Sequence, residues 1–237
     1  MTLATNQPKT SRQDVRPPFE SGMRLTREEF RQRWERHPEV AHAERIEGVV
    51  VMPAAKRHVE HGRPHRALEA WLSRYEYSTE GVEGSLAASV AIDEENDPEP
   101  DSILFVRADC GGRCRITVDG YLEGSPELVG EVSGSTVSTD LGRKREIYER
   151  NGVGEYLVWL TAASEIRWFR LREAGFQPLV ADAQGIVRSE VFPGLWLDVS
   201  AMLRGDMQRV LEVLNEGLAS PEHASFVQSL RERGGKD

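Results

Sequence analysis

Residues 131–160 read EVSGSTVSTDLGRKREIYERNGVGEYLVWL. Their pattern predicts a strand, a helix and a second strand, in that order. The first strand begins upstream, so that residues 128–132 read Leu-Val-Gly-Glu-Val. A helix is predicted over residues 138–151, because Asn151-Gly152 is a typical helix stop. The apolar run at residues 156–160 then predicts a buried strand. This order favours an α/β fold.

Working outward, the flanking segments extend the same pattern. Residues 26–29 form a capping box that begins a short helix, and residues 43–52 predict a hairpin with its turn at Glu47-Gly48. A helix of roughly twenty residues is predicted from about His58, with one apolar face. Further strands are predicted at residues 86–92, 102–106, 166–171 and 186–191, and an amphipathic helix at residues 200–218.

Composition limits the classes of protein that this chain can represent. It has 237 residues, 39% of them hydrophobic, and a formal net charge of −9, which argues against unspecific nucleic-acid binding through overall charge. No apolar run reaches the ~18 residues of a membrane span, and the start shows no signal peptide, so we expect a cytoplasmic protein without membrane contact. Cys110 and Cys114 are too few for a tetrahedral zinc site and are expected to be structural or incidental.

The chain is expected to contain one folded domain. Residues 1–22 are polar and rich in proline, so they predict a disordered N-terminal arm. Residues 23–218 predict the domain, with a mixed central β-sheet flanked by helices, and residues 219–237 predict a short helix or C-terminal tail.

Three acidic residues stand at the edges of otherwise apolar strands. Glu44 lies in the predicted hairpin, Asp101 follows Pro100 before a strand, and Glu131 lies within Leu-Val-Gly-Glu-Val. A carboxylate in such a position is costly unless it is paired or bound to a cation. If these carboxylates converge, a divalent cation would relieve their repulsion, and oxygen ligands suit Mg²⁺ or Mn²⁺.

The helix after Glu131 carries Asp140, Lys144 and Tyr148 at intervals of four, so they are expected on one helical face. That face is expected to be polar and exposed, outside the apolar core. A lysine at this end of a strand can orient or deprotonate a water, or stabilise charge on a phosphate.

Each of these residues also has a simpler interpretation. Asp140 and Lys144 could form a plain surface ion pair, Asp101 could be a turn residue after proline, and Glu44 could be a hairpin edge residue. His61 and His65 share a helix face and could bind a metal. With no third ligand near them in the sequence, we interpret them as polar, solvent-facing histidines.

The order of these segments resembles the Uma2 family of restriction endonucleases within the PD-(D/E)XK nuclease superfamily. The resemblance covers about residues 24–203 and is most specific over residues 131–160. Further matches are ERIEGVVVMP at residues 44–53, then His61 followed by Leu68 and Leu72, then Pro100-Asp101, and FPGLWLD at residues 192–198.

The resemblance implies a restriction-endonuclease-like fold and an active site at Glu44, Asp101, Glu131 and Lys144. Asp101 and Glu131 would be metal ligands together with Glu44, and Asp140 and Tyr148 would support them. The superfamily's lysine usually stands two residues after the second acid, where this chain has Ser133. The family implies that the lysine has moved to the following helix, at Lys144.

These observations predict a Mg²⁺- or Mn²⁺-dependent endonuclease that hydrolyses phosphodiester bonds of nucleic acid. DNA is the favoured substrate. A homodimer is one oligomeric state that the protein could form. Arg113, Arg115, Arg143 and Arg145 are candidates for phosphate contacts. One alternative is a non-catalytic metal- or nucleic-acid-binding module that retains the fold. Another, glycoside hydrolysis by paired carboxylates, is disfavoured by Lys144 and by the lack of an aromatic-lined substrate pattern.

Overall fold

A mixed sheet forms the centre of the computed structural model, which describes residues 19–235; within that range the sheet has six strands. Its strands are β3 (Val82–Leu86), β5 (Ser102–Val106), β8 (Leu128–Ser133), β9 (Glu155–Leu160), β10 (Glu165–Arg172) and β11 (Gly175–Pro178). Their spatial order is β11-β10-β9-β8-β5-β3. β8 and β9 run parallel and the other neighbouring pairs are antiparallel. The predicted mixed α/β fold class is therefore confirmed.

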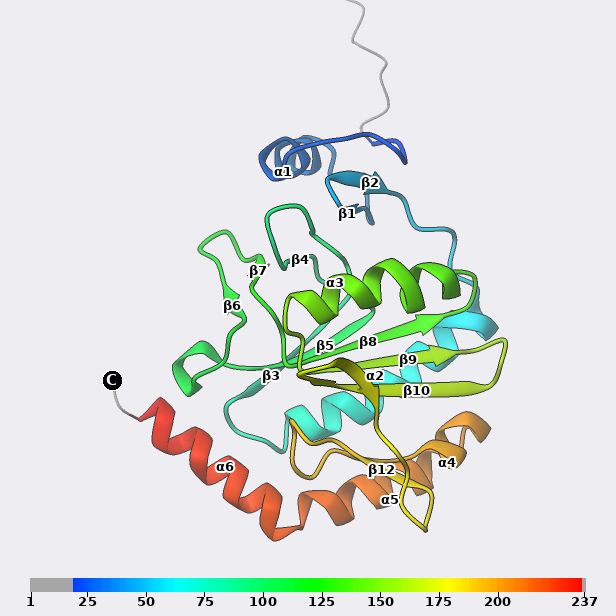
Figure 1. Cartoon of the computed structure of the whole chain (residues 1–237), viewed down its shortest axis with the longest axis vertical. Coiled ribbons are helices and arrows are strands. Elements are labelled where there is room, and N and C mark those ends of the chain that lie inside the picture. Colours follow the sequence, from blue (N-terminus) through cyan, green and yellow to red (C-terminus); the bar gives the residue numbers. More distant parts are fainter. Residues whose placement is uncertain (1–18, 236–237) are drawn as a thin grey trace, which may run out of the picture.

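Helices cover both faces of this sheet (Figure 1). One face carries α2 (Arg63–Glu76), which continues from the π-helical turn η1 (His58–Gly62), together with α4 (Val199–Arg204), α5 (Met207–Leu218) and α6 (Pro221–Gly234). The other face carries the π-helical segment η3 (Thr139–Lys144) and α3 (Arg145–Arg150). The crossover from β8 to β9 runs through η3 and α3, as a parallel pair requires.

Side chains alternate between the two faces along each central strand. In β5, Leu104 and Val106 pack toward α2, whereas Ile103 and Phe105 pack toward α3. β8 follows the same rule, with Leu128 and Val132 toward α2 and Val129 toward α3. Because Glu131 is two residues after Val129, its side chain belongs to the α3 face.

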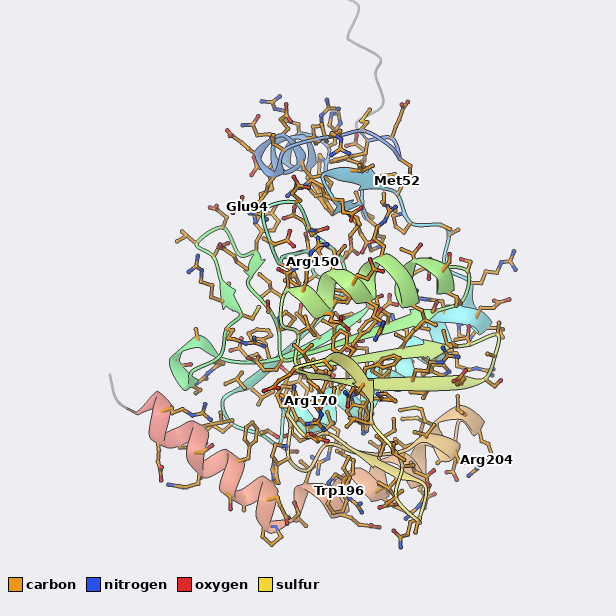
Figure 2. The ribbon with its side chains drawn as sticks, in the orientation of Figure 1. Met52, Glu94, Arg150, Arg170, Trp196 and Arg204 are labelled. Carbon is orange, nitrogen blue, oxygen red and sulfur yellow. The ribbon has the colours of Figure 1, made fainter. Side chains whose placement is uncertain are left out.

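A smaller layer caps the α3 side of the sheet. It holds α1 (Arg27–Arg36) and the hairpin of β1 (Glu44–Ile46) and β2 (Val49–Val51). Figure 1 shows both beyond α3, and Figure 2 labels Met52, next to β2, and Glu94 in this region. The remaining elements are η2 (Ala108–Cys110), a small sheet of β4 (Val90–Ala91), β7 (Leu122–Glu123) and β6 (Arg115–Ile116), and the pair β12 (Ile186–Arg188) and β13 (Trp196–Asp198).

The structure confirms two local predictions, the helix cap at residues 26–29 and the hairpin turn at Glu47-Gly48. The Thr26 hydroxyl accepts from the Glu29 amide while the Glu29 carboxylate accepts from the Thr26 amide, which is the predicted capping box. Glu47 and Gly48 form the predicted hairpin turn with positive φ angles of 53° and 73°.

Three predicted elements have different bounds in the structure. The strand expected at residues 86–92 is divided, because Ala87 has a φ of 48° and separates β3 from β4. The helix expected at residues 200–218 ends at Gly205, whose φ of 76° stops α4 before α5 begins. The strand expected at residues 186–191 stops at Arg188, and β11 and β13 were not predicted.

The segments expected as arm and tail are described only in part. Residues 1–18, most of the expected arm, lie outside the described residues, but Phe19 is buried and packs edge-on against Phe30. Beyond residue 218, α6 forms a helix whose Leu230 is fully buried. Within residues 19–235, every helix is too short or too polar to cross a lipid bilayer.

Candidate active site

Lys144 stands at the centre of a buried ionic cluster. Its ammonium Nζ lies 2.7 Å from Glu44 Oε1 and 3.0 Å from Glu131 Oε1. The Tyr148 hydroxyl donates to the same Glu131 oxygen at 3.1 Å. Three elements therefore meet at one point: the β1 hairpin, strand β8, and the helical segment that follows β8.

Glu44 reaches the cluster because the hairpin is fixed over the sheet. The Glu99 amide donates to Glu44 Oε1 at 2.8 Å, which joins the hairpin to the loop before β5. On the other side of the hairpin, the buried Arg45 guanidinium pairs with Asp97 at 2.6 Å. These contacts set the position of the Glu44 carboxylate relative to Lys144.

Asp101 joins the cluster through the backbone of β8. Its Oδ2 accepts a hydrogen bond from the Val132 amide at 2.8 Å, so its carboxylate lies beside the residue that follows Glu131. Its Oδ1 lies 2.8 Å from Lys56 Nζ and 3.2 Å from His61 Nε2. The structure thus brings Asp101 next to Glu131, but one Asp101 oxygen points to a second set of side chains.

Asp140 and Lys144 are not on an exposed polar face, so that expectation is wrong. Their exposed fractions are 3% and 6%. η3 is a π-helical segment with non-helical backbone at Gly142, so the spacing of a regular α-helix does not apply to it. The Thr136 hydroxyl donates to Asp140 at 2.5 Å, and Lys144 pairs with the two glutamates instead. A plain surface ion pair is therefore excluded.

Burial and neighbouring charges determine the ionisation of the cluster. Burial alone would favour a neutral Lys144, but the Glu131 and Glu44 carboxylates raise its pKa well above the ordinary value. Burial raises the pKa of Glu131 well above its usual range; Lys144 opposes this rise, and the charges of Asp140, Asp101 and Glu44 add to it. Despite burial, contacts with His61 and Lys56 hold the pKa of Asp101 below its usual value.

His61 and His65 are not solvent-facing, because both rings are turned toward Asp101. His61 Nδ1 lies 3.1 Å from the Val132 carbonyl oxygen, and His65 Nε2 lies 2.9 Å from the Asp101 carbonyl oxygen. The third potential metal ligand, which the sequence did not show near the two histidines, is Asp101. It is distant along the chain but adjacent to both rings in space. Lys56 was also missed, since it lies in a loop without any periodic pattern.

Of the four arginines expected to contact phosphate, Arg143 directly precedes Lys144 in the chain; it is exposed and pairs with Glu47 at 3.4 Å. Arg145 is occupied by the Phe176 carbonyl and by the Phe169 ring. Arg113 binds the Gly152 carbonyl, at the end of the sheet where β9 begins. Arg115 pairs with Glu123 in the small β6–β7 sheet.

Comparison with known proteins places this chain in a family. The model of the Uma2 family, described as "Putative restriction endonuclease", matches residues 27–200, and the chain therefore belongs to this family. A crystal structure described as "a putative nuclease belonging to DUF820 from Anabaena variabilis ATCC 29413" is 12% identical, covers 68% of this chain and 90% of that chain, and has a TM-score of 0.47. Comparison with curated proteins gave no match.

Proposed function

We propose that this protein is a metal-dependent endonuclease that hydrolyses phosphodiester bonds of nucleic acid, with DNA as substrate and Mg²⁺ or Mn²⁺ as cofactor. The observation that carries the proposal is the buried Lys144 ammonium held between Glu131 and Glu44, with Asp101 beside them on the Val132 amide. Membership of a family described as restriction endonucleases supports a phosphodiester as the substrate.

The charges of the cluster fit a divalent cation. Glu44, Asp101, Glu131 and Asp140 are buried, and Lys144 and Lys56 are the ammonium groups that face them. If all six groups are ionised, two negative charges remain without a partner in this set. Buried carboxylates that crowd together are stabilised by a cation, and oxygen donors suit Mg²⁺ or Mn²⁺. Asp101, Glu131 and Glu44 would hold the ion.

The side chains of the cluster have separable roles in hydrolysis. A divalent cation, when bound, polarises the scissile phosphate and lowers the pKa of an attacking water. Lys144 keeps its proton because its pKa is raised, so its role is to stabilise negative charge on the phosphate and not to act as a base. The Tyr148 hydroxyl and the Glu99 amide hold Glu131 and Glu44 in position. The exposed guanidinium of Arg143 would exchange its partner Glu47 for a phosphate of the nucleic-acid backbone.

The test is cleavage of single- and double-stranded DNA and RNA with Mg²⁺, Mn²⁺ or EDTA. We expect cleavage of DNA with either metal and none with EDTA. Glu131→Gln should lower the rate by roughly two to four orders of magnitude, because it removes a ligand charge while keeping the side-chain shape.

Glu155→Gln provides the matched control. Glu155 is a buried carboxylate in the neighbouring strand, but it accepts hydrogen bonds from Trp168 and Ser189 on the α2 side of the sheet. The folded fraction of this variant should cleave at the wild-type rate. If the wild type cleaves none of these nucleic acids with any of these metals, the endonuclease proposal fails and the non-catalytic binding module takes its place.

A further inference from the structure

A second cluster of metal-ligating side chains lies between α2 and the sheet. His61 in η1 and His65 in α2 are one helical turn apart, and Asp101 precedes β5. One potential ligand atom from each residue lies within 4.8 Å of the other two. The three side chains are 12%, 15% and 7% exposed, so the cluster is largely shielded from water.

The hydrogen bonds of His61 leave one nitrogen aimed at a carboxylate. A carbonyl oxygen accepts only, so Nδ1 of His61 must carry the hydrogen that it donates to Val132 O. In a neutral ring, Nε2 would present a lone pair 3.2 Å from Asp101 Oδ1, which is also an acceptor; a protonated ring would instead donate to that oxygen. The Nε2 atom is buried and has no hydrogen-bond partner within the described residues. Two acceptors facing each other in this way are stabilised by a cation that both can bind.

Both imidazoles are anchored as metal-binding histidines usually are. A ligand histidine commonly donates its other N–H to a backbone carbonyl, which fixes the tautomer and the ring orientation. His61 makes this contact with Val132, and the His65 ring is held beside Asp101 by that residue's own carbonyl.

The Lys56 ammonium already places a positive charge beside the Asp101 carboxylate. Lys56 Nζ lies 2.8 Å from Oδ1, the same oxygen that faces His61. The Lys56 side chain is 38% exposed and belongs to the loop between β2 and η1, outside the helices and strands. Its ammonium marks a position where a cation is favoured.

The geometry points to a binding site for one divalent transition-metal ion of the Zn²⁺ class, held by His61, His65 and Asp101. Two imidazoles and one carboxylate suit Zn²⁺, Co²⁺ or Ni²⁺, whereas Mg²⁺ prefers oxygen ligands alone. The site uses neither Glu131 nor Lys144, so it does not depend on the proposed nuclease activity. Asp101 takes part in both sites.

Metal titration of the full-length protein, without a histidine tag, tests the site. Co²⁺ gives a visible absorption spectrum on binding, and Zn²⁺ should displace it with one equivalent per chain. His61→Gln should weaken Co²⁺ and Zn²⁺ binding by about 100-fold or more, since even loss of an indirect contact to a metal ligand costs 10–100-fold. His58→Gln is the matched control, because His58 is an exposed histidine of the same helix and should leave the affinity unchanged.

Two further measurements separate this site from the nuclease site. Glu131→Gln should keep the Co²⁺ affinity while losing cleavage, and Lys56→Met should bind Co²⁺ more tightly because the competing ammonium is gone. X-ray absorption of the Zn²⁺-loaded wild type should show nitrogen ligands, which gives an answer even if His61→Gln fails to fold. An all-oxygen shell, no spectral change up to millimolar Co²⁺, or equal losses in His61→Gln and His58→Gln would overturn the assignment.

Discussion

Lys144 shows how burial and charge together define a single residue. A buried ammonium is stable only where carboxylates and hydrogen bonds replace water, and here Glu44 and Glu131 both lie within 3.0 Å of Nζ. Removing the lysine would leave two buried carboxylates without their partner, so its loss affects folding as well as chemistry.

We expect Lys144→Met to lower the free energy of unfolding by about 3–5 kcal/mol at neutral pH, as measured by urea denaturation. The sign follows from the raised pKa of Lys144: the stability it contributes is complete below the ordinary value of 10.5 and is lost as the pH rises through the higher folded value. Titration of Lys144 itself should therefore add no pH dependence to the difference between variant and wild type from pH 7 to 9. A loss below about 1 kcal/mol would indicate a surface-type ion pair instead.

At this scale the sequence predicts which residues are unusual better than which residues meet. Glu131 could be recognised because a carboxylate within an apolar strand is costly without a partner. The approach of His61 to Asp101 could not, since it depends on how α2 packs against β5. Lys144 was predicted as a site residue on an exposed face, but its burial depends on the π-helical turn.

Among the helices, the break between α4 and α5 can be tested by a substitution at Gly205. The sign of the resulting stability change distinguishes two separate helices from one continuous helix. Gly205 ends α4 in the left-handed region with a φ of 76°, and an added Cβ would meet nothing within 4 Å. Gly205→Ala should therefore destabilise the protein by about 1 kcal/mol through backbone strain alone. In one continuous helix over residues 200–218, the same change would stabilise by a similar amount. Thermal or urea denaturation distinguishes the two.

The docking of α6 is expected to depend on pH through His223. Burial lowers the pKa of His223, whose Nδ1 contacts the Leu218 carbonyl and whose Nε2 contacts the Thr79 hydroxyl. Because the folded pKa lies below the ordinary value of 6.5, the stability contributed by neutral His223 is present above that value and is lost as the pH falls below it. Amides of α6 should exchange faster at pH 5.5 than at 7.5 after correction for intrinsic rates. In His223→Gln this extra pH dependence should disappear.

Helices and strands were predictable where a local signal marks their ends. The capping box at Thr26 and the turn at Glu47-Gly48 are such signals. The break at Ala87 is not, because alanine rarely adopts positive φ and nothing in its neighbourhood of the sequence indicates it. The edge strand β11 carries little hydrophobic pattern and forms by pairing with β10.

At the scale of the whole molecule, the ionic cluster around Lys144 forms only where three layers, the hairpin, the sheet and the β8–β9 crossover, pack together. The hairpin supplies Glu44, the sheet supplies Asp101 and Glu131, and the crossover between β8 and β9 supplies Lys144. The resemblance named these four residues as the predicted site. For Lys144, a parallel crossover also places the helix beside the strand that precedes it. The distances could not be predicted, because they depend on contacts such as Glu99 to Glu44 across 55 positions of the chain.

The metal-dependent stability of the whole chain tests whether these layers form one ion site. Burial raises the pKa of Glu131, and the charges of Asp140, Asp101 and Glu44 add to that rise against the opposing effect of Lys144. An ion that binds only the folded state would stabilise these carboxylates in their ionised form. At a Mg²⁺ or Mn²⁺ concentration of 100 times Kd, binding adds about 2.7 kcal/mol, which for a chain of this size is a rise in Tm of roughly 5–10 °C. Ca²⁺ should raise Tm without supporting cleavage. Asp101→Asn should lose the Mg²⁺-dependent rise, whereas Glu155→Gln, with its carboxylate on the opposite face of the sheet, should keep it. An Asp101→Asn variant with the full wild-type shift would show that the ion binds elsewhere.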